Sequence, residues 1–502
     1  MSNTSPADAN ASAGLILAGI ETEYGFTVEG RSADDQIEDA IAFVRGYPGP
    51  CFAGWDYCYE SPRADLRGFR LDRLAVDPED AKRDTGKTYG TPHEVRSDRI
   101  LPNGARFYND HGHPEYATPE CWSLDELVLH DTAGQFVLLR AARVLSEATG
   151  RAVSVYKNNT DFHGSSYGTH ENYLVPRELG FERLYAAVTP MLIARQILCG
   201  AGKVGSESGP RADFQLTARG DFFAEPANAE TLFRRPVFNT RDEPHAAPQT
   251  WIRLHVISGD ANMIPSCTRR KVGLVKLALM LEIAGQAPRW NIPQPVRAFS
   301  ALSRDETREF RIALDGRNWT TAYDVIESYL AAAEQTLELN AEFKSLVAEC
   351  RELLSDLAGP GALAPRSIDW AAKKELLEAY RGEAGASWRE PVLQAYDLEY
   401  HNIDPAEGLY FALESMEQVD PMPSLDERLA RIESAPERTR AFARGLAVSR
   451  FSNLLTRACW RSITLDLEGQ ELELELPPNK LYSAQLEAAD DVGTFIQILR
   501  NS

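Results

Sequence analysis

The sequence GIETEYG, residues 19–25, places two glutamates two positions apart inside a run of apolar and small residues, and this pattern decides the expected fold. Successive side chains of a β-strand point to opposite faces, so Glu21 and Glu23 would share one face. Two carboxylates on a half-buried face repel each other, and their burial requires a cation. Hard oxygen ligands of this kind suit Mg²⁺ that bridges nucleotide phosphates. The alternative is an exposed strand with two solvated glutamates, which is the commoner origin of an isolated pair.

A second cluster, NGARFYNDHGHPEY, occupies residues 103–116. Tyr108 and Asp110 would share a strand face, and Glu115 follows after a turn rich in glycine and proline. Asp110 is a candidate base or nucleophile, and Glu115 is a candidate metal ligand. The alternative, equally frequent without context, is a turn whose aspartate and histidines cap backbone groups.

Three further segments alternate in the same sense. Their polar positions are His170 and Asn172 in residues 157–174, Gln215, Thr217 and Arg219 in residues 214–223, and Arg253 and His255 in residues 251–262. A single histidine on such a strand is more often structural. Polar faces on several strands are costly unless the sheet lines a wet site that contains metal, so together they indicate one polar cleft. Arg219 and Arg253 would then neutralise phosphate oxygens.

The sequence contains neither a Walker A motif nor a Gly-x-Gly-x-x-Gly loop that opens a helix, which argues against a P-loop or Rossmann nucleotide site. The acidic cleft is therefore the better candidate for binding a nucleotide.

Alternation of strands and helices along the chain predicts an α+β fold. The expected strands are residues 15–28, 105–110, 153–157, 170–175, 212–219 and 251–258, and the expected helices are residues 124–148, 181–199, 322–357, 369–381 and 425–456. Residues 463–467 and 472–476 flank Glu468-Gly469-Gln470 and predict a hairpin.

The pattern divides the chain into three parts. Residues 1–14 are rich in Ser, Asn, Ala and Asp and predict a disordered tail. Residues 15–421 would form the main catalytic domain, with a long exposed loop at about 56–102 that shows little periodicity. Residues 422–502 would form a small C-terminal domain, because Pro421 and Pro423 interrupt the chain at its start.

Composition excludes several classes of protein. A formal net charge of −21 argues against a chain that coats nucleic acid or an anionic membrane. Seven cysteines without a Cys-x-x-Cys pair disfavour a disulfide framework and a zinc knuckle, and they fit a reducing cytoplasm. No apolar run approaches the ~20 residues needed to cross a bilayer.

The motifs GIETEYG, NGARFYNDHGHPEYATPEC, YKNNTDFHGSSYGTHENYLV, NTRDEPHA and RLHVISGDAN resemble those of the Pup ligase and depupylase family. The enzymes of this family are relatives of glutamine synthetase and the carboxylate–amine ligases. The similarity runs from residue 15 to about 263 and returns weakly at residues 458–462. It implies a glutamine-synthetase-like fold, in which a curved antiparallel β-sheet forms a cradle packed with helices.

The resemblance also implies roles for individual residues. Asp110 would be the catalytic aspartate. ATP and Mg²⁺ would be the cofactors, with Glu21, Glu23, Glu115, His170 and His255 at the metal and Tyr108, Arg219, Arg241 and Arg253 at the nucleotide, its phosphates or the transition state.

Residues 55–69, WDYCYESPRADLRGF, are similar to the insertion that marks the depupylase branch and that the ligase branch lacks. The segment departs from the usual pattern at Cys58 and in the order Arg63-Ala64-Asp65. The implied reaction is hydrolysis of the isopeptide bond between the C-terminal Glu side chain of Pup, a small disordered modifier, and a substrate lysine. Deamidation of a C-terminal Gln of Pup would be the same chemistry with ammonia as the leaving group.

The expected partners are Pup, pupylated proteins and proteasome-associated machinery in the cytoplasm. Two alternatives remain open: a Pup–protein ligase that works through an acyl phosphate, and a non-catalytic Pup-binding regulator that kept the fold. Whether Asp110 attacks the carbonyl or activates a water also remains open.

Overall fold

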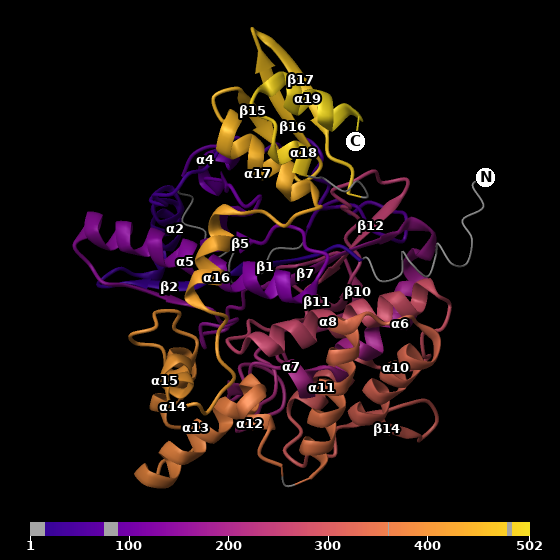
Figure 1. The fold of residues 1–502 in the computed structure, drawn as a ribbon. Helices are drawn as coiled ribbons and strands as arrows, with labels where there is room; N and C mark the ends of the chain where they lie inside the picture. Colours follow the sequence, from indigo (N-terminus) through magenta and orange to yellow (C-terminus); the bar gives the residue numbers. More distant parts are fainter. Residues whose placement is uncertain (1–15, 75–88, 360, 479–483, 502) are drawn as a thin grey trace.

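A six-stranded antiparallel sheet lies in the middle of the molecule (Figure 1). The computed structural model describes residues 16–74, 89–359, 361–478 and 484–501, so the predicted tail at 1–14 lies outside the described residues. In spatial order the strands are β12 (Trp251–Val256), β7 (Thr169–Pro176), β1 (Ala18–Glu23), β5 (His113–Ala117), β4 (Arg106–Asp110) and β3 (Arg99–Ile100). The expected α+β class and the antiparallel sheet are confirmed.

Strand β1 shows why the sheet has two unlike faces. Along it, fully buried residues alternate with half-buried ones, as the period of two predicts. Ala18 and Ile20 join the main hydrophobic core, together with Tyr173 of β7 and Leu254 of β12. The opposite face carries the glutamates. One face of the sheet therefore anchors the fold, and the other is left for polar side chains.

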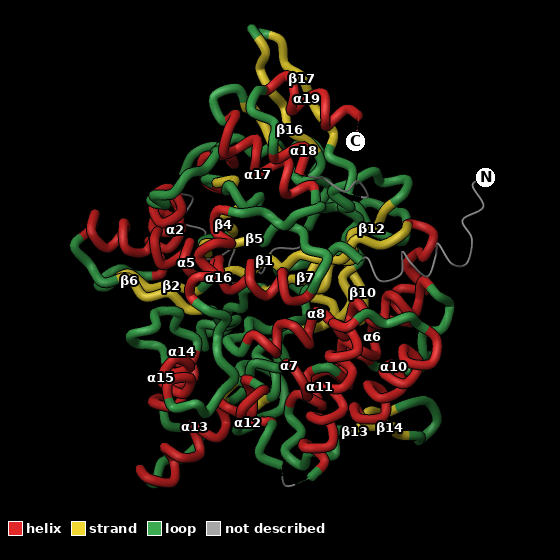
Figure 2. The backbone as a smooth tube through the Cα atoms, viewed as in Figure 1, coloured by secondary structure: helices red, strands yellow, loops and turns green. Residues whose placement is uncertain are grey.

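Helices cover the apolar face and surround the sheet (Figure 2). The longest of the described helices is α5 (Leu124–Thr149), which ends at Gly150 in the left-handed conformation. Helices α6 (Gly180–Ala194) and α8 (Pro265–Ile283) contribute many buried residues to the main core. The described helices also include α2 (Gln36–Arg45), α4 (Pro92–Arg96), α6 (Gly180–Ala194), α7 (Gln196–Cys199), α8 (Pro265–Ile283), α9 (Pro295–Ser303), α10 (Ala322–Thr336), α11 (Ala341–Ala358), α12 (Ala364–Ser367), α13 (Asp369–Ala384), α14 (Pro391–Tyr400), α15 (Leu409–Ser415), α16 (Leu425–Glu433), α17 (Arg440–Phe451), α18 (Ala484–Glu487) and α19 (Val492–Asn501). Among the residues that the structure describes, no helix has the length and apolar composition needed to cross a membrane.

Smaller strand pairs lie outside the central sheet. They are β2 (Gly25–Val28) with β6 (Val153–Tyr156), β8 (Lys203–Val204) with β9 (Phe214–Gln215), β10 (Phe223–Asn228) with β11 (Arg235–Asn239), and β13 (Arg311–Ala313) with β14 (Trp319–Thr321). The prediction of a strand at residues 212–219 is wrong beyond Gln215. From there the backbone turns toward other partners, since the Leu216 amide donates to the Ser303 carbonyl.

Two long predicted helices are each divided in two in the structure. Residues 322–357 form α10 and α11, because Asn340 accepts a hydrogen bond from the Phe343 amide and starts a new helix. Residues 425–456 form α16 and α17 and then enter strand β15 (Leu455–Ala458). A further predicted helix, at residues 181–199, is divided between α6 and α7.

The C-terminal segment has a core of its own. Strands β15, β16 (Ser462–Leu467) and β17 (Gln470–Glu475) form a three-stranded sheet, and the predicted hairpin between the last two is confirmed. Its turn residues Glu468 and Gly469 both have positive φ, as a two-residue turn that matches strand twist requires. This core also includes Trp55 from the N-terminal half of the chain. Our division at residue 422 stays a prediction.

The described part of the predicted loop at about 56–102 is docked on the protein at several points. Asp65 is 2% exposed and accepts a hydrogen bond from the Thr240 hydroxyl at 2.5 Å. The Asp56 amide donates to the Ala458 carbonyl at 2.9 Å. The loop therefore connects the C-terminal core to the segment that follows β11, while the expectation of a long exposed loop at about 56–102 stays a prediction.

A buried charge cluster joins α17 to the segment after β5. Arg440 Nε donates to Glu120 Oε1 at 2.6 Å, and Arg444 Nη2 donates to Glu120 Oε2 at 2.7 Å. Burial by itself raises the pKa of Glu120, but the charges of Arg444 and Arg440 outweigh it and lower that pKa to about 2. This carboxylate therefore stabilises the fold as an anion.

We expect Glu120→Gln to lower the free energy of unfolding by ~3–5 kcal/mol, because it leaves two buried guanidinium groups without their counter-charge. The matched control is Glu475→Gln, which breaks an exposed pair with Arg461 and should cost no more than ~1 kcal/mol. Urea unfolding followed by tryptophan fluorescence measures both. A loss as small in Glu120→Gln as in the control would contradict the role of this cluster.

The same carboxylate makes stability depend on pH. Its folded pKa of about 2 lies below the ~4.3 of an unfolded glutamate, so its contribution is complete above the unfolded value and is lost as pH falls toward 2. The difference in Tm between the unmodified chain and Glu120→Gln should therefore shrink on acidification below pH ~4.3. A difference that stays constant would argue against an ionised Glu120.

Candidate active site

Most of the residues that the sequence singled out lie on the polar face of the central sheet. The register places Glu21 of β1 opposite His170 of β7, and Glu23 opposite Glu115 of β5. On the outer strands, Tyr108 pairs with Glu115, and His255 pairs with Asn172. Four sequence segments that are far apart in the chain thus bring acidic and imidazole side chains together.

The first group of side chains surrounds Glu21. His255 Nε2 lies 3.0 Å from Glu21 Oε1, and His170 Nδ1 lies 3.4 Å from the same oxygen. Burial would raise the pKa of Glu21, but hydrogen bonds from the two imidazoles outweigh it and hold that pKa well below its usual value. Burial, reinforced by the charge of Arg253, keeps the pKa of His255 well below its usual value.

The second group consists of Glu23, Asp110 and Glu115, whose carboxylate oxygens lie within 4.8 Å of one another. The Gly168 amide donates to Glu23 Oε2 at 2.9 Å, and the Tyr108 hydroxyl donates to Glu115 Oε1 at 2.5 Å. Burial and the negative charges of Asp110, Glu21 and Glu23 raise the pKa of Glu115 well above its usual value. A cation in this group would relieve that repulsion.

The donor sets of the two groups differ in the metal that they fit. Three carboxylates offer only hard oxygen ligands, which is the set that Mg²⁺ prefers. One carboxylate with two imidazoles offers mixed ligands, and imidazole is more typical of transition metals than of Mg²⁺. The group of Glu23, Asp110 and Glu115 is therefore the better match to Mg²⁺.

Asp110 lies at the end of β4, where the chain turns through His111 and Gly112, both with positive φ. Burial would raise its pKa, but the charges of His111 and Arg96 outweigh that effect, and the pKa is lowered. An ionised carboxylate at a strand end can attack a carbonyl carbon or take a proton from water.

The three predicted arginines are not equivalent. Arg253 is already engaged: its Nη1 donates to Asn172 Oδ1 at 2.6 Å, and its Nη2 lies 3.3 Å from Glu243 Oε2. Arg219 is 1% exposed, donates to the backbone carbonyls of Tyr167 and Ile257, and forms no ion pair with a carboxylate in the described part of the chain.

Burial lowers the pKa of Arg219 to about 9, and the charge of Arg235 adds to this effect. Arg241 resembles Arg219, since burial lowers its pKa and its Nε has no hydrogen-bond partner among the described residues. Among the described residues, neither guanidinium forms an ion pair with a carboxylate, and such groups in a mostly buried setting fit an anionic ligand.

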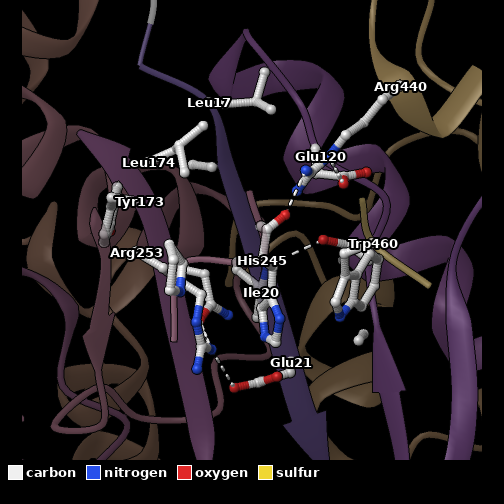
Figure 3. Close-up of a pocket in the computed structure, with 16 residues that line it drawn as sticks. Leu17, Ile20, Glu21, Glu120, Tyr173, Leu174, His245, Arg253, Arg440 and Trp460 are labelled. Atoms are coloured by element: carbon white, nitrogen blue, oxygen red, sulfur yellow. Dashed lines mark hydrogen bonds and ion pairs between the residues drawn. The ribbon is translucent and has the colours of Figure 1, made fainter. Parts of the chain in front are cut away.

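A small cavity of about 70 Å³ opens beside Glu21 on the same face of the sheet (Figure 3). Its walls come from β1, β7 and β12 and from the C-terminal segment, which contributes Arg440 and Trp460. The lining combines the aliphatic side chains of Leu17 and Leu174 with a few polar groups, as small-molecule pockets generally do.

Two predicted positions do not belong to the site, and several residues of the site were not predicted. Gln215 donates to Asp221, and Thr217 donates to Asp260 at 2.5 Å, both outside the central sheet. Reasoning from the sequence missed four residues near the site, namely Arg96, Glu243, Arg440 and Trp460. Arg96 lies within the predicted loop at about 56–102, which shows little periodicity, and the signal near Trp460 was the weak return of similarity at residues 458–462.

The comparisons with known proteins agree with this geometry. A protein named depupylase from Acidothermus cellulolyticus is 37% identical over 479 residues, which cover 92% of this chain and 93% of that protein. A protein named Pup deamidase/depupylase from Mycobacterium tuberculosis is 35% identical over 475 residues, which cover 91% of this chain and 92% of that protein.

Among solved structures, the complex between the prokaryotic ubiquitin-like protein Pup and its ligase PafA matches with a TM-score of 0.76 and 27% identity, covering 98% of this chain and 94% of that chain. This likeness confirms the fold expected from the motifs. A family model described as Pup-ligase protein matches residues 16–464. The chain therefore belongs to the Pup-ligase protein family.

Proposed function

We propose that this chain is a depupylase: an enzyme that hydrolyses the isopeptide bond between the C-terminal Glu side chain of Pup and a substrate lysine. Deamidation of a C-terminal Gln of Pup would follow the same route. The observation that carries the proposal is an Asp110 carboxylate whose pKa is lowered and which lies in one group with Glu23 and Glu115. Relatives named for depupylation align with this chain over about nine-tenths of its length.

The loop at residues 55–69 supports hydrolysis over ligation. Its Ser61 amide donates to Glu243, the residue that also holds Arg253, and its Asp65 forms a backbone bridge with Arg241. The insertion thus contacts the segment that carries two of the predicted arginines. A Pup–protein ligase remains the second candidate, because the same sheet and the likeness to PafA fit it.

The reaction can be written with the residues of this chain. Asp110 either attacks the carbonyl carbon of the isopeptide, giving an acyl intermediate that water hydrolyses, or removes a proton from the attacking water. In both routes the C–N bond breaks, the lysine amine leaves with a proton, and the carboxylate of Pup forms. Arg219 and Arg241 are suited to stabilise the negative charge on the former carbonyl oxygen.

ATP and Mg²⁺ are the proposed cofactors. Bound Mg²⁺ would offset the repulsion between carboxylates and hold nucleotide phosphates. We assign Glu23 and Glu115 as the primary ligands of Mg²⁺, and Glu21, His170 and His255 as the ligands of a second metal position. Tyr108 orients Glu115 through its hydroxyl. The cavity beside Trp460 is the proposed site for one end of the nucleotide, since its volume of about 70 Å³ is too small for the whole molecule, and Arg253 lies on its wall.

The remaining assignments follow from this function. Pup and pupylated proteins are the proposed partners, with proteasome-associated machinery as a further one, and the cytoplasm is the proposed location. The C-terminal domain, residues 422–502, would complete the nucleotide site through Arg440 and Trp460.

The direct test incubates the protein with a Pup conjugate and ATP and follows release of the free substrate protein, alongside an active depupylase. We expect release without stoichiometric ADP. ADP formed in step with new conjugates, on mixing Pup, a lysine substrate and ATP, would instead favour the ligase. If no substrate protein is released from the conjugate while the active depupylase releases it, the proposed hydrolase function is wrong.

We expect Asp110→Asn to lower the rate of depupylation by at least ~100-fold, since an amide can neither attack nor accept a proton. Nucleotide binding, measured by calorimetry, should stay within about twofold of the unmodified chain, because the cavity beside Trp460 is not lined by Asp110. Asp404→Asn, which alters only a local turn, is the matched control. Full activity of Asp110→Asn would refute the role given to Asp110.

Removal of one carboxylate ligand should weaken Mg²⁺ binding. We expect Glu115→Gln to raise the half-saturating Mg²⁺ concentration by about tenfold or more, because the amide carries no charge. His255→Gln should have a smaller effect if the oxygen-rich group is the primary site. Titration of Mg²⁺ at fixed ATP measures both variants, and a larger effect for His255→Gln would reverse the assignment.

A further inference from the structure

Helix α4 presents an arginine to the catalytic aspartate. Arg96 Nη1 lies 2.6 Å from Asp110 Oδ1, and the guanidinium also lies 5.7 Å from the centre of the Tyr108 ring. His111 Nε2 approaches the same oxygen at 3.7 Å. Oδ1 is enclosed and accepts no well-aligned hydrogen bond from the described residues, so charge and proximity hold the pair.

The position of α4 is fixed from two sides. Arg45 of α2 donates to the Glu94 carbonyl at 2.9 Å and to the Ser97 hydroxyl at 3.0 Å. The Asn109 side chain, next to Asp110 in β4, donates to the Val95 carbonyl at 2.9 Å. The strand that carries the aspartate therefore also holds the helix that carries the arginine.

The charges around Asp110 explain why a cation is needed at this oxygen. Glu23 and Glu115 crowd Asp110 on one side and repel its ionised form. A metal ion bound by all three groups would relieve the repulsion, but it would also occupy the oxygen lone pairs that attack or proton removal requires. A guanidinium at Oδ1 supplies positive charge and leaves Oδ2, which no described side chain engages by a hydrogen bond, to face the substrate.

We propose that Arg96 is a positioning residue that holds Asp110 by Oδ1, so that Oδ2 is directed at the carbonyl or the water. The proposal rests on the depupylase function. Arg96 is placed to act through Asp110, and its side chain is about one-third exposed, so its replacement should leave the fold intact.

The experiment compares Arg96→Ala, Arg96→Lys and Arg99→Ala in the full chain. Arg99 is the matched control because its guanidinium donates to the carbonyls of Ser97 and Asp98 and forms no ion pair with the part of the chain that the structure describes. We expect Arg96→Ala to lower kcat by about 100-fold, the effect of a reactive group misplaced by ~1 Å. The KM for the Pup conjugate and the Kd for ATP should stay within about twofold. The kcat of Arg96→Lys should lie between that of Arg96→Ala and that of the unmodified chain, since lysine keeps the charge and loses the planar fork.

Chemical rescue separates positioning from a structural role. Guanidinium chloride added at millimolar, non-denaturing concentration should restore part of the kcat of Arg96→Ala, and it should restore nothing in Asp110→Asn. The proposal is overturned if Arg96→Ala keeps full activity. It is also overturned if guanidinium does not restore the lost kcat of Arg96→Ala and the variant has a lower Tm than the unmodified chain. These results require an active unmodified chain. An unmodified chain that releases no substrate would refute the proposed function itself, and the role of Arg96 with it.

Discussion

Repulsion between partly buried carboxylates on one face of the central sheet is the constraint around which the site is arranged. Glu21, Glu23, Asp110 and Glu115 lie close enough that each raises the cost of ionising another. The protein offsets this repulsion in part with its own groups. Two imidazoles hold Glu21, and a backbone amide and a tyrosine hydroxyl hold Glu23 and Glu115. What remains uncompensated is the oxygen-rich group, where a divalent cation fits.

The apolar face of the same strands stabilises this arrangement by burial in the main core. Ile20, Tyr173 and Leu254 pack into the main core, so the backbone of β1, β7 and β12 is held rigidly by burial. A strand that is fixed on one face directs its other side chains to fixed places. The site therefore gains its order from the hydrophobic side of the sheet, because strands anchored in the core position the clustered carboxylates of Glu21, Glu23 and Glu115.

The sequence predicted the parts of the site that depend on local alternation. Glu21, Glu23 and Glu115, and with them His170 and His255, could be placed on one face because a strand has a period of two and antiparallel neighbours share faces. Arg219 was expected on a strand face, and it is buried near the site although its segment is not a strand. Arg96 and Trp460 had no periodic signal, because tertiary contacts alone bring them to the sheet. Helix breaks such as the one at Asn340 were missed for a different reason, since a single capping residue outweighed a continuous helical pattern.

The segments without periodicity meet at Arg106, a neighbour of Asp110 on β4. Its guanidinium lies 4.0 Å from the ring centre of Trp55 in the loop and 3.9 Å from that of Tyr108. Trp55 in turn packs edge-on against Trp460, with ring centres 5.2 Å apart. This stack joins the tyrosine that holds Glu115, the inserted loop and the wall of the cavity. The loop and the C-terminal segment therefore both pack, through Trp55, against the guanidinium that lies over the Tyr108 ring, so the packing of these side chains connects them to the tyrosine beside Glu115.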